Sequence, residues 1–183
     1  MEKIKFEINN LQTRLLEVIL AIEFKDSILR QSQIKAFYPQ LDFIERALLE
    51  NLIIKTATLI ENGKDVQFNI LKPINRLSTN RPFTITFEEN LEKIISIKTS
   101  IESKLQEPIC KTILEIRTKY IAHNDLHKRS SLTIEINELR NLVEYLLDRI
   151  NNLCQLINLP TSRFHEHENH SLDKLLLALA AVK

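Results

Sequence analysis

Residues 139–157 decide the fold most clearly and read LRNLVEYLLDRINNLCQLI. Their apolar residues recur at alternating steps of four and three, at Leu139, Val143, Leu146, Ile150, Leu153 and Ile157. This heptad spacing predicts a helix that begins between residues 133 and 138 and ends before Pro160. The apolar face has two interpretations, the core of a helical bundle or the seam of a dimer. We expect the bundle core, because such stripes usually face the interior of their own domain.

Two further helices are predicted in the first third of the chain. Apolar residues at three- and four-residue steps predict an amphipathic helix over about 6–37. Asp26 lies on its apolar face, so we expect this carboxylate either at an exposed helix end or beside a partner. Residues 40–62 are apolar on several sides, which is typical of a helix at the centre of a bundle. Gly63 then ends that helix.

The remaining segments are also expected to be helical or irregular. We interpret residues 64–86 as a long irregular connection with a short helix near 74–77. A third helix is predicted over 88–106 and a fourth over 108–122, where proline is well tolerated in the first turn. A short apolar helix is expected at 172–182, with a serine as its N-cap.

Glycine content points to the same fold class. The chain has one glycine in 183 residues, whereas the tight turns of a β-rich fold require many. The sequence therefore predicts an all-α, up-and-down bundle of about five to six helices with one long irregular connection. We expect one bundle over 1–158, with a polar linker and short helix over 159–183 packed on the same domain.

Charge and composition narrow the classes of function. The formal net charge is +1, which excludes a protein that coats nucleic acid through a strong basic excess. No apolar run approaches the ~18 residues of a membrane span, and the charged N-terminus lacks a signal-peptide apolar stretch. We therefore expect a cytoplasmic protein with no membrane partner. Cys110 and Cys154 fall inside apolar helical patterns and are expected to be reduced core residues.

Arg117 breaks the apolar pattern of the fourth helix. On a helical wheel, the residues within about 60° of it are Cys110, Ile113, Leu114, Tyr120 and Ile121. An arginine stays charged, and burying it without a partner costs several kcal/mol. Arg117 should therefore pair with a carboxylate, such as Asp26 or a glutamate on a neighbouring helix, or face a solvent-filled cleft or subunit interface.

His123 follows Arg117 by six residues, which is about 120° around an ideal helix. The two side chains share a face only if the helix ends or loosens near His123. Asn124 and Asp125 come next, and residues of this type end helices and form turns. A structural interpretation, a histidine bonded to a free carbonyl at a helix end, stands beside the functional one.

The string around these residues resembles a known family. Residues 116–125 read IRTKYIAHND. Arg117-x5-His123, late in a core helix, is similar to the Arg-x4-6-His signature of the HEPN superfamily. The full string resembles the R-x-K-x-I-A-H-x-D form of the AbiU2-like branch, which is linked to phage abortive infection. Residues 47–71, an apolar helix that ends in an acidic turn, resemble the same branch, and the resemblance covers about 1–158.

The resemblance implies a metal-independent endoribonuclease of a phage-defence or toxin–antitoxin system. In HEPN ribonucleases two protomers pair so that two motifs face one cleft, which implies a homodimer. It further implies that His123 is the general acid or base, that Arg117 grips the scissile phosphate, and that Asn124 and Asp125 orient His123. No cofactor, metal or DNA is implied; RNA is the substrate, a cognate antitoxin is a further partner, and the products carry 2′,3′-cyclic phosphates.

One residue departs from the family pattern. Many active HEPN ribonucleases have a polar amide or acid directly after the arginine, whereas Thr118 stands here. Thr118 can still hydrogen-bond in a supporting role, but it is shorter and lacks an amide. A second hypothesis is therefore a non-catalytic HEPN module that binds RNA, a nucleotide or a protein partner. A third is an interaction protein in which Arg117 is only a member of an ion pair.

Two other groups of polar residues carry weaker hypotheses. His165, His167 and His170 are interleaved with glutamates, but this spacing is not a recognised zinc arrangement. We interpret the segment as a polar linker and predict no metal site. His127, beside Lys128 and Arg129, is interpreted as a solvated turn.

Overall fold

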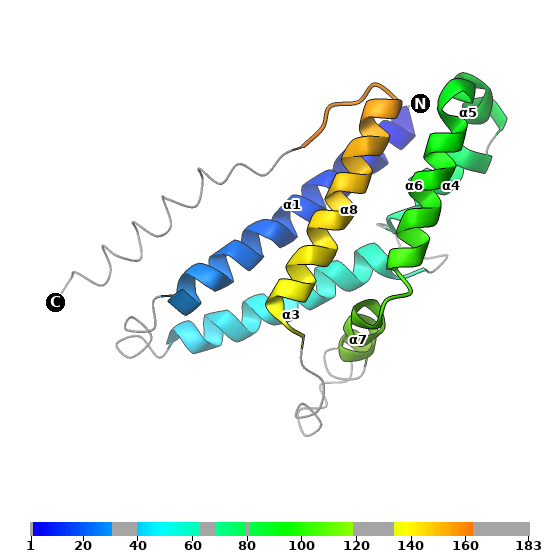
Figure 1. The fold of residues 1–183 in the computed structure, drawn as a ribbon. Coiled ribbons are helices and arrows are strands. Elements are labelled where there is room, and N and C mark those ends of the chain that lie inside the picture. Colours follow the sequence, from blue (N-terminus) through cyan, green and yellow to red (C-terminus); the bar gives the residue numbers. More distant parts are fainter. Residues whose placement is uncertain (1, 31–39, 63–68, 80, 119–133, 163–183) are drawn as a thin grey trace.

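A computed structural model describes residues 2–30, 40–62, 69–79, 81–118 and 134–162. Within these residues the chain contains helices and no strands (Figure 1). The elements in chain order are α1 (Glu2–Arg30), α3 (Gln40–Ile60), α4 (Leu71–Thr79), α5 (Arg81–Thr86), the 3₁₀ turn η1 (Glu88–Asn90), α6 (Leu91–Lys104), α7 (Pro108–Ile116) and α8 (Ile136–Leu156). The predicted all-α class is confirmed.

The three longest helices form the centre of the bundle. The most extensive helix–helix contacts join α1 to α8 and α1 to α3. On its other side α8 packs against α6, and α6 in turn packs against α4 (Figure 1). The short helix α7 packs against α3. This last contact fixes the position of Arg117, which directly follows α7.

The heptad face of α8 lies in the core of the protomer itself. Its six apolar residues, Leu139, Val143, Leu146, Ile150, Leu153 and Ile157, are each at most 3 % exposed. Burying an aliphatic side chain of this size stabilises a fold by roughly 1.5–3 kcal/mol. The bundle-core interpretation is therefore confirmed, because α1 and α6 already cover the face that a dimer seam would need.

The irregular connection expected over 64–86 is wrong for residues 71–79 and 81–86, which form α4 and α5, whereas the short helix expected near 74–77 is confirmed within α4. In α4, Leu71, Ile74 and Leu77 are buried at helical spacing. Asn69 starts this helix, since its Oδ1 accepts a hydrogen bond of 2.7 Å from the Leu71 amide. The prolines of both helices lie near their first turns, where the missing amide hydrogen would have no partner in any case.

The other boundaries agree in part with expectation. The helices predicted over 40–62 and from 133–138 onward are confirmed as α3 and α8. The helix predicted over 6–37 begins earlier, at Glu2, and is described only to Arg30. The helix expected at 172–182 lies outside the described residues, and the proposed division of the chain at residue 158 stays a prediction.

Both cysteines are buried free thiols, as expected. Burial raises the pKa of Cys110 and of Cys154 to about 11. Gln12 Nε2 lies 3.4 Å from Cys154 Sγ and also donates to the carbonyl of Pro160 at 3.1 Å. These contacts hold the chain after α8 against α1. Among the described helices none is long and apolar enough to cross a membrane.

Candidate functional site

The site begins with α7, whose sequence positions Arg117. Pro108 occupies the first turn and follows Glu107, whose backbone is extended. Cys110, Ile113 and Ile116 are buried, so this face of the helix is fixed against the bundle. Arg117 directly follows on the same side of the helix and keeps a helical backbone, with φ −56° and ψ −45°. The apolar contacts of α7 therefore determine where the guanidinium of Arg117 reaches the surface.

The helix changes its winding at Arg117 and Thr118, where α geometry widens to π geometry. Short stretches of π geometry inside α-helices are frequent at functional sites. Thr118 is exposed to solvent. His123, Asn124 and Asp125 lie outside the described residues, so their arrangement stays a prediction.

The carboxylate of Glu61, which directly follows α3, pairs with Arg117 at two points. Arg117 Nη1 donates to Glu61 Oε1 at 3.2 Å, and Nη2 lies 3.0 Å from Oε2. Arg117 and Glu61 are 35 % and 30 % exposed at their side chains, so the pair lies at the surface of the α3–α7 contact. Two parallel contacts fix the plane of a guanidinium better than one contact does.

Glu61 is itself held in place by the backbone around it. Its amide donates to the carbonyl of Ala57 at 2.8 Å, which continues the helical pattern by one residue. Its carbonyl accepts a hydrogen bond from Asn69 Nδ2. A glutamate on a neighbouring helix is among the partners that the sequence predicts for Arg117, but Glu61 itself is not predicted. The acidic turn that ends residues 40–62 is the feature of the sequence that points to Glu61.

Asp26, the other partner considered for Arg117, pairs instead with Arg140 of α8. Arg140 also binds Glu23, one turn earlier on α1. Burial alone lowers the pKa of Arg140, but Glu23 and Asp26 together raise it above its ordinary value. Asp26 lies on the apolar side of α1 because it has this partner. The ion pairs of Arg140 with Asp26 and Glu23 join α1 to α8. Asp26 is therefore not the partner of Arg117, which pairs with Glu61.

A pocket of about 410 Å³ is lined by residues close in the chain to Arg117 and Glu61, although neither of these two lines it. Leu114, one turn before Arg117 on α7, and Asn62, directly after Glu61, both line it. Its remaining lining residues are Ile60, Leu71, Glu102, Leu105, Gln106 and Lys111. The pocket thus has aliphatic walls with amide and charged groups among them. An apolar cavity with a few convergent polar groups is the usual form of a ligand site.

The described residues contain no group of three or more His, Cys, Asp or Glu side chains that could hold a metal ion. The His165–His170 cluster and His127 fall outside the described ranges. Within the part of the chain that the structure describes, Glu61 contacts Nη1 and Nη2 of Arg117. A guanidinium has five N–H donors and can bind a carboxylate or a phosphate.

Comparison with known proteins identifies the family. The family model HEPN_AbiU2, described as AbiU2, matches residues 30–175. This chain belongs to the HEPN AbiU2 family. The match confirms the family resemblance drawn from the sequence, over residues 30–175 where about 1–158 was expected, and it includes Glu61 and Arg117. No curated protein and no solved structure matches the chain significantly. Membership of the AbiU2 family is consistent with a role in abortive-infection defence.

Proposed function

We propose that this AbiU2-family protein is a metal-independent endoribonuclease that acts in phage defence or as a toxin. The observation that carries the proposal is the two-point contact of Glu61 with Arg117, whose side chain is about one-third exposed, inside the family match. A guanidinium that is oriented by a carboxylate and still open to solvent suits phosphate binding.

The proposed reaction is a transesterification within the RNA chain. The ribose 2′-oxygen attacks the adjacent phosphorus, the bond from phosphorus to the 5′-oxygen breaks, and a 2′,3′-cyclic phosphate forms. His123 removes the proton from the 2′-hydroxyl or supplies one to the leaving 5′-oxygen, a task that suits a side chain with a pKa near neutrality. Arg117 neutralises the charge that develops on the phosphate oxygens.

The proposal includes a homodimer in which two Arg117–His123 segments face one cleft. The heptad face of α8 is buried in the protomer, so the dimer contact has to use another surface. Arg117 lies where α7 packs against α3. A dimer contact near this part of the bundle would bring the motifs of the two protomers together. Thr118 and the exposed π turn would then face the shared RNA site.

Cleavage of RNA in the presence of EDTA tests the activity. Purified protein is incubated with total RNA and with tRNA, beside His123→Ala, Arg117→Ala and the matched control His165→Ala. We expect wild type and His165→Ala to cleave and to leave cyclic-phosphate ends, and the two motif variants to lose cleavage by a factor of at least about 100. Thermal unfolding of each variant shows that the fold is kept. Equal cleavage by wild type and His123→Ala would refute the proposed role of His123.

A second candidate function is a non-catalytic module that binds RNA, a nucleotide or a protein partner. Thr118 after the arginine and the net charge of +1 favour it. In that case all variants are inactive while RNA retention on a filter depends on Arg117. A third candidate, in which Arg117 is only structural, predicts that Arg117→Ala lowers stability and that His123→Ala changes nothing.

A further inference from the structure

Helix α1 carries an apolar ridge that is open to solvent in the part of the chain that the structure describes. Gln12, Leu16, Leu20 and Phe24 follow one another at four-residue steps, so their side chains form one row along the helix. Gln12, at the start of the row, is buried, whereas Leu20 is 42 % exposed. Leu16 and Phe24 are half-buried. We call Leu16, Leu20 and Phe24 the α1 ridge.

The α1 ridge lies on the outer side of its helix, between the contacts with α8 and with α3. Gln12 donates to Asn151 of α8 at 3.1 Å, and Glu17 accepts from Lys55 of α3 at 2.8 Å. On a helical wheel Gln12 and Glu17 are about 140° apart, and Leu20 lies between them, about 80° from Gln12 and about 60° from Glu17. The fully buried residues of α1 occupy the opposite arc: Ile8, Leu15, Val18 and Ile22.

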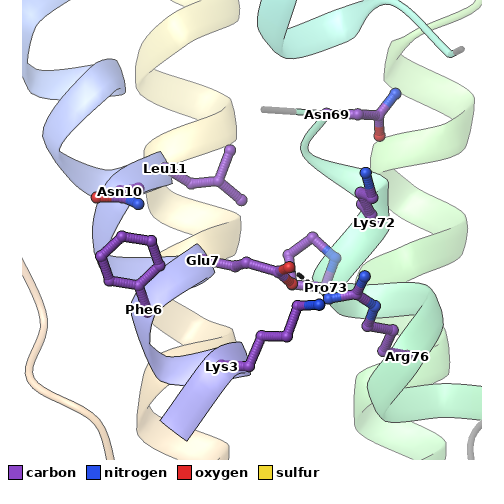
Figure 2. A pocket seen from close by; sticks show the side chains of 9 residues that line it. All are labelled: Lys3, Phe6, Glu7, Asn10, Leu11, Asn69, Lys72, Pro73 and Arg76. Carbon is purple, nitrogen blue, oxygen red and sulfur yellow. Dashed lines mark hydrogen bonds and ion pairs between the residues drawn. The ribbon is translucent and has the colours of Figure 1, made fainter. Parts of the chain in front are cut away.

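The first turns of α1 continue the same outer arc. Glu7 pairs with Arg76 of α4, and Figure 2 shows Lys3 and Glu7 reaching across to α4 while Phe6 stays on the α1 side. Phe6 is 66 % exposed. It precedes Leu20 by 14 residues, which is close to four helical turns, so the two side chains lie on one side of α1. The outer arc therefore has exposed apolar side chains both before and after Gln12.

The chain that follows α8 turns back at the level of Gln12. The carbonyl of Pro160 accepts a hydrogen bond from Gln12 at 3.1 Å. The amide of Ser162 donates to the Asn151 side chain at 3.0 Å, and its carbonyl accepts from the same side chain at 2.7 Å. Asn151 precedes Leu156, the last residue of α8, by more than one turn. The chain at Ser162 has therefore reversed its direction, as the orange segment of Figure 1 shows.

This reversed chain runs in the direction of the α1 ridge. Helix α1 is antiparallel to α8, because Gln12 contacts Asn151 whereas Asp26 contacts Arg140. A chain that runs back along α8 therefore runs forward along α1, from Gln12 towards Leu20. Phe6 lies in the other direction. The ridge is thus the apolar surface of α1 that the chain reaches first after Ser162.

Residues 172–182 have the sequence pattern of an amphipathic helix that requires a partner surface. An isolated helix of this length is marginal in water, and a packed apolar face is what stabilises such a helix in a protein. The linker 163–171 spans up to ~30 Å when extended, whereas Leu20 lies only about 12 Å beyond Gln12 along α1. The apolar residues of the segment recur at three- and four-residue steps: Leu172, Leu175, Leu176, Leu179 and Val182.

We propose that residues 172–182 pack as a helix on the α1 ridge of their own chain. The segment is predicted from its sequence to pack on this domain, and the direction of the chain at Ser162 selects the ridge as the surface. A short tether gives the segment an effective concentration on the order of millimolar at the ridge, which favours the same chain over a second copy. This contact is independent of the proposed cleavage reaction, since the ridge shares no residue with the Arg117–His123 segment.

Thiol labelling of the full chain tests whether the ridge is covered. Leu20→Cys reports on the ridge, and the matched controls are Ile95→Cys, at a residue of α6 that is 44 % exposed, and Phe6→Cys. We expect Leu20→Cys to react at least about tenfold more slowly than either control, because a covered thiol reacts only when the contact opens. Peptide mapping separates these thiols from the buried Cys110 and Cys154. Equal rates for Leu20→Cys and Ile95→Cys overturn the proposal.

Charges placed in the segment show whether the segment is what covers the ridge. Leu176→Asp and Leu179→Asp together should raise the labelling rate of Leu20→Cys to within about twofold of Ile95→Cys, because the apolar face of the segment is lost. Ala181→Asp, on the opposite side of the segment, should leave the rate unchanged. Circular dichroism checks that each variant keeps its helices. Slow labelling of Leu20→Cys that persists in the double aspartate variant overturns the proposal.

Disulfide cross-linking then distinguishes the same chain from a second copy. Leu20→Cys is combined with Leu176→Cys or with Leu179→Cys and oxidised with copper–phenanthroline. We expect a disulfide within one chain, seen as a monomer on a non-reducing gel and as one linked peptide pair. Ile95→Cys combined with Leu176→Cys should give no such product. Disulfide-linked dimers as the main product overturn the assignment to the same chain and identify a second copy as the source of the segment.

Discussion

Arg117, which follows α7, and Glu61, which follows α3, form a two-point ion pair with separations of 3.2 and 3.0 Å. The two residues are 56 positions apart in the chain and meet because α7 packs against α3. The ion pair lies where the α3–α7 contact reaches the surface, and residues close to it in the chain line a pocket. Glu61 orients the guanidinium of Arg117, and this orientation is the basis of the proposed chemistry.

A double-mutant cycle should measure the strength of this pair. Arg117→Ala, Glu61→Ala and the double variant are compared by urea unfolding. Because both side chains are about one-third exposed, we expect a coupling free energy of about 0.5–1 kcal/mol that shrinks in 1 M salt. Glu107, which pairs with Lys104 instead, is the control, and its coupling to Arg117 should be near zero. A zero value for Glu61 as well would contradict the observed geometry.

Arg117→Lys should separate charge from geometry in RNA cleavage. Lysine keeps the positive charge but cannot make the planar two-point contact with Glu61. We expect cleavage of tRNA to fall at least about tenfold while the free energy of unfolding changes by less than ~1 kcal/mol. Arg14→Lys, on the exposed part of α1, should leave cleavage unchanged. Full activity of Arg117→Lys would mean that a point charge suffices at this position.

Arg140→Leu should destabilise the protein much more than an exposed arginine substitution does. Removing Arg140 leaves Glu23 and Asp26, both largely buried, without their shared cation. We expect the free energy of unfolding to fall by about 2–4 kcal/mol, because two largely buried carboxylates lose the cation that binds both of them. Arg14→Leu, whose pair with Glu17 is half-exposed, should cost less than ~1 kcal/mol. If Arg140→Leu and Arg14→Leu lower the free energy of unfolding by similar amounts, the ion pairs between α1 and α8 contribute little to stability.

Ile150→Ala tests whether the heptad face of α8 is the core of the protomer. Ile150 is fully buried, so the substitution should lower the free energy of unfolding by about 2–5 kcal/mol. The matched control Ile95→Ala, at a residue that is 44 % exposed, should cost less than ~1 kcal/mol. The loss in Ile150→Ala should be the same at all protein concentrations. A loss that depends on concentration would point to a dimer seam instead.

The two buried thiols predict a fall in stability at high pH. Burial raises the pKa of Cys110 and Cys154 from 9.0 to about 11. A raised folded-state pKa means that the folded protein holds the thiol protons more tightly than the unfolded chain. This contribution to stability is complete below pH 9 and is lost as the pH rises towards 11. Urea unfolding at pH 8, 9 and 10 should therefore give a steeper decline for wild type than for the double variant Cys110→Ala/Cys154→Ala.

Thiol labelling offers an independent check on the same residues. At pH 8 the thiolate fraction of a group with a pKa near 11 is on the order of one in a thousand, so native protein should react slowly. Urea should release both thiols for fast reaction. Rapid labelling of two thiols in the native state would contradict their burial.

The local sequence was enough to predict both the AbiU2 family and the helical secondary structure of this chain. The alternation of four- and three-residue steps in 139–157 specifies one apolar face, because side chains three and four apart lie on one side of a helix. The string 116–125 resembles a form of the AbiU2-like branch, and the family match confirms the family itself. The full length of α4 and the presence of α5 were not predicted, because a proline that breaks a helix interior is harmless near the first turn, and the position of a first turn depends on its cap.

Only the tertiary structure decided which charges meet. By sequence alone Arg117 had several candidate carboxylates, since α1, α3, α6 and α8 each carry more than one, and Asp26 was as reasonable a partner as a glutamate. Because α1 packs against α8, Asp26 pairs with Arg140, and because α7 packs against α3, Glu61 pairs with Arg117. The ion pair of Glu7 on α1 with Arg76 on α4 likewise joins residues 69 positions apart. Local periodicity determines which face of a helix is buried, whereas the partner of a polar side chain depends on which helices pack together.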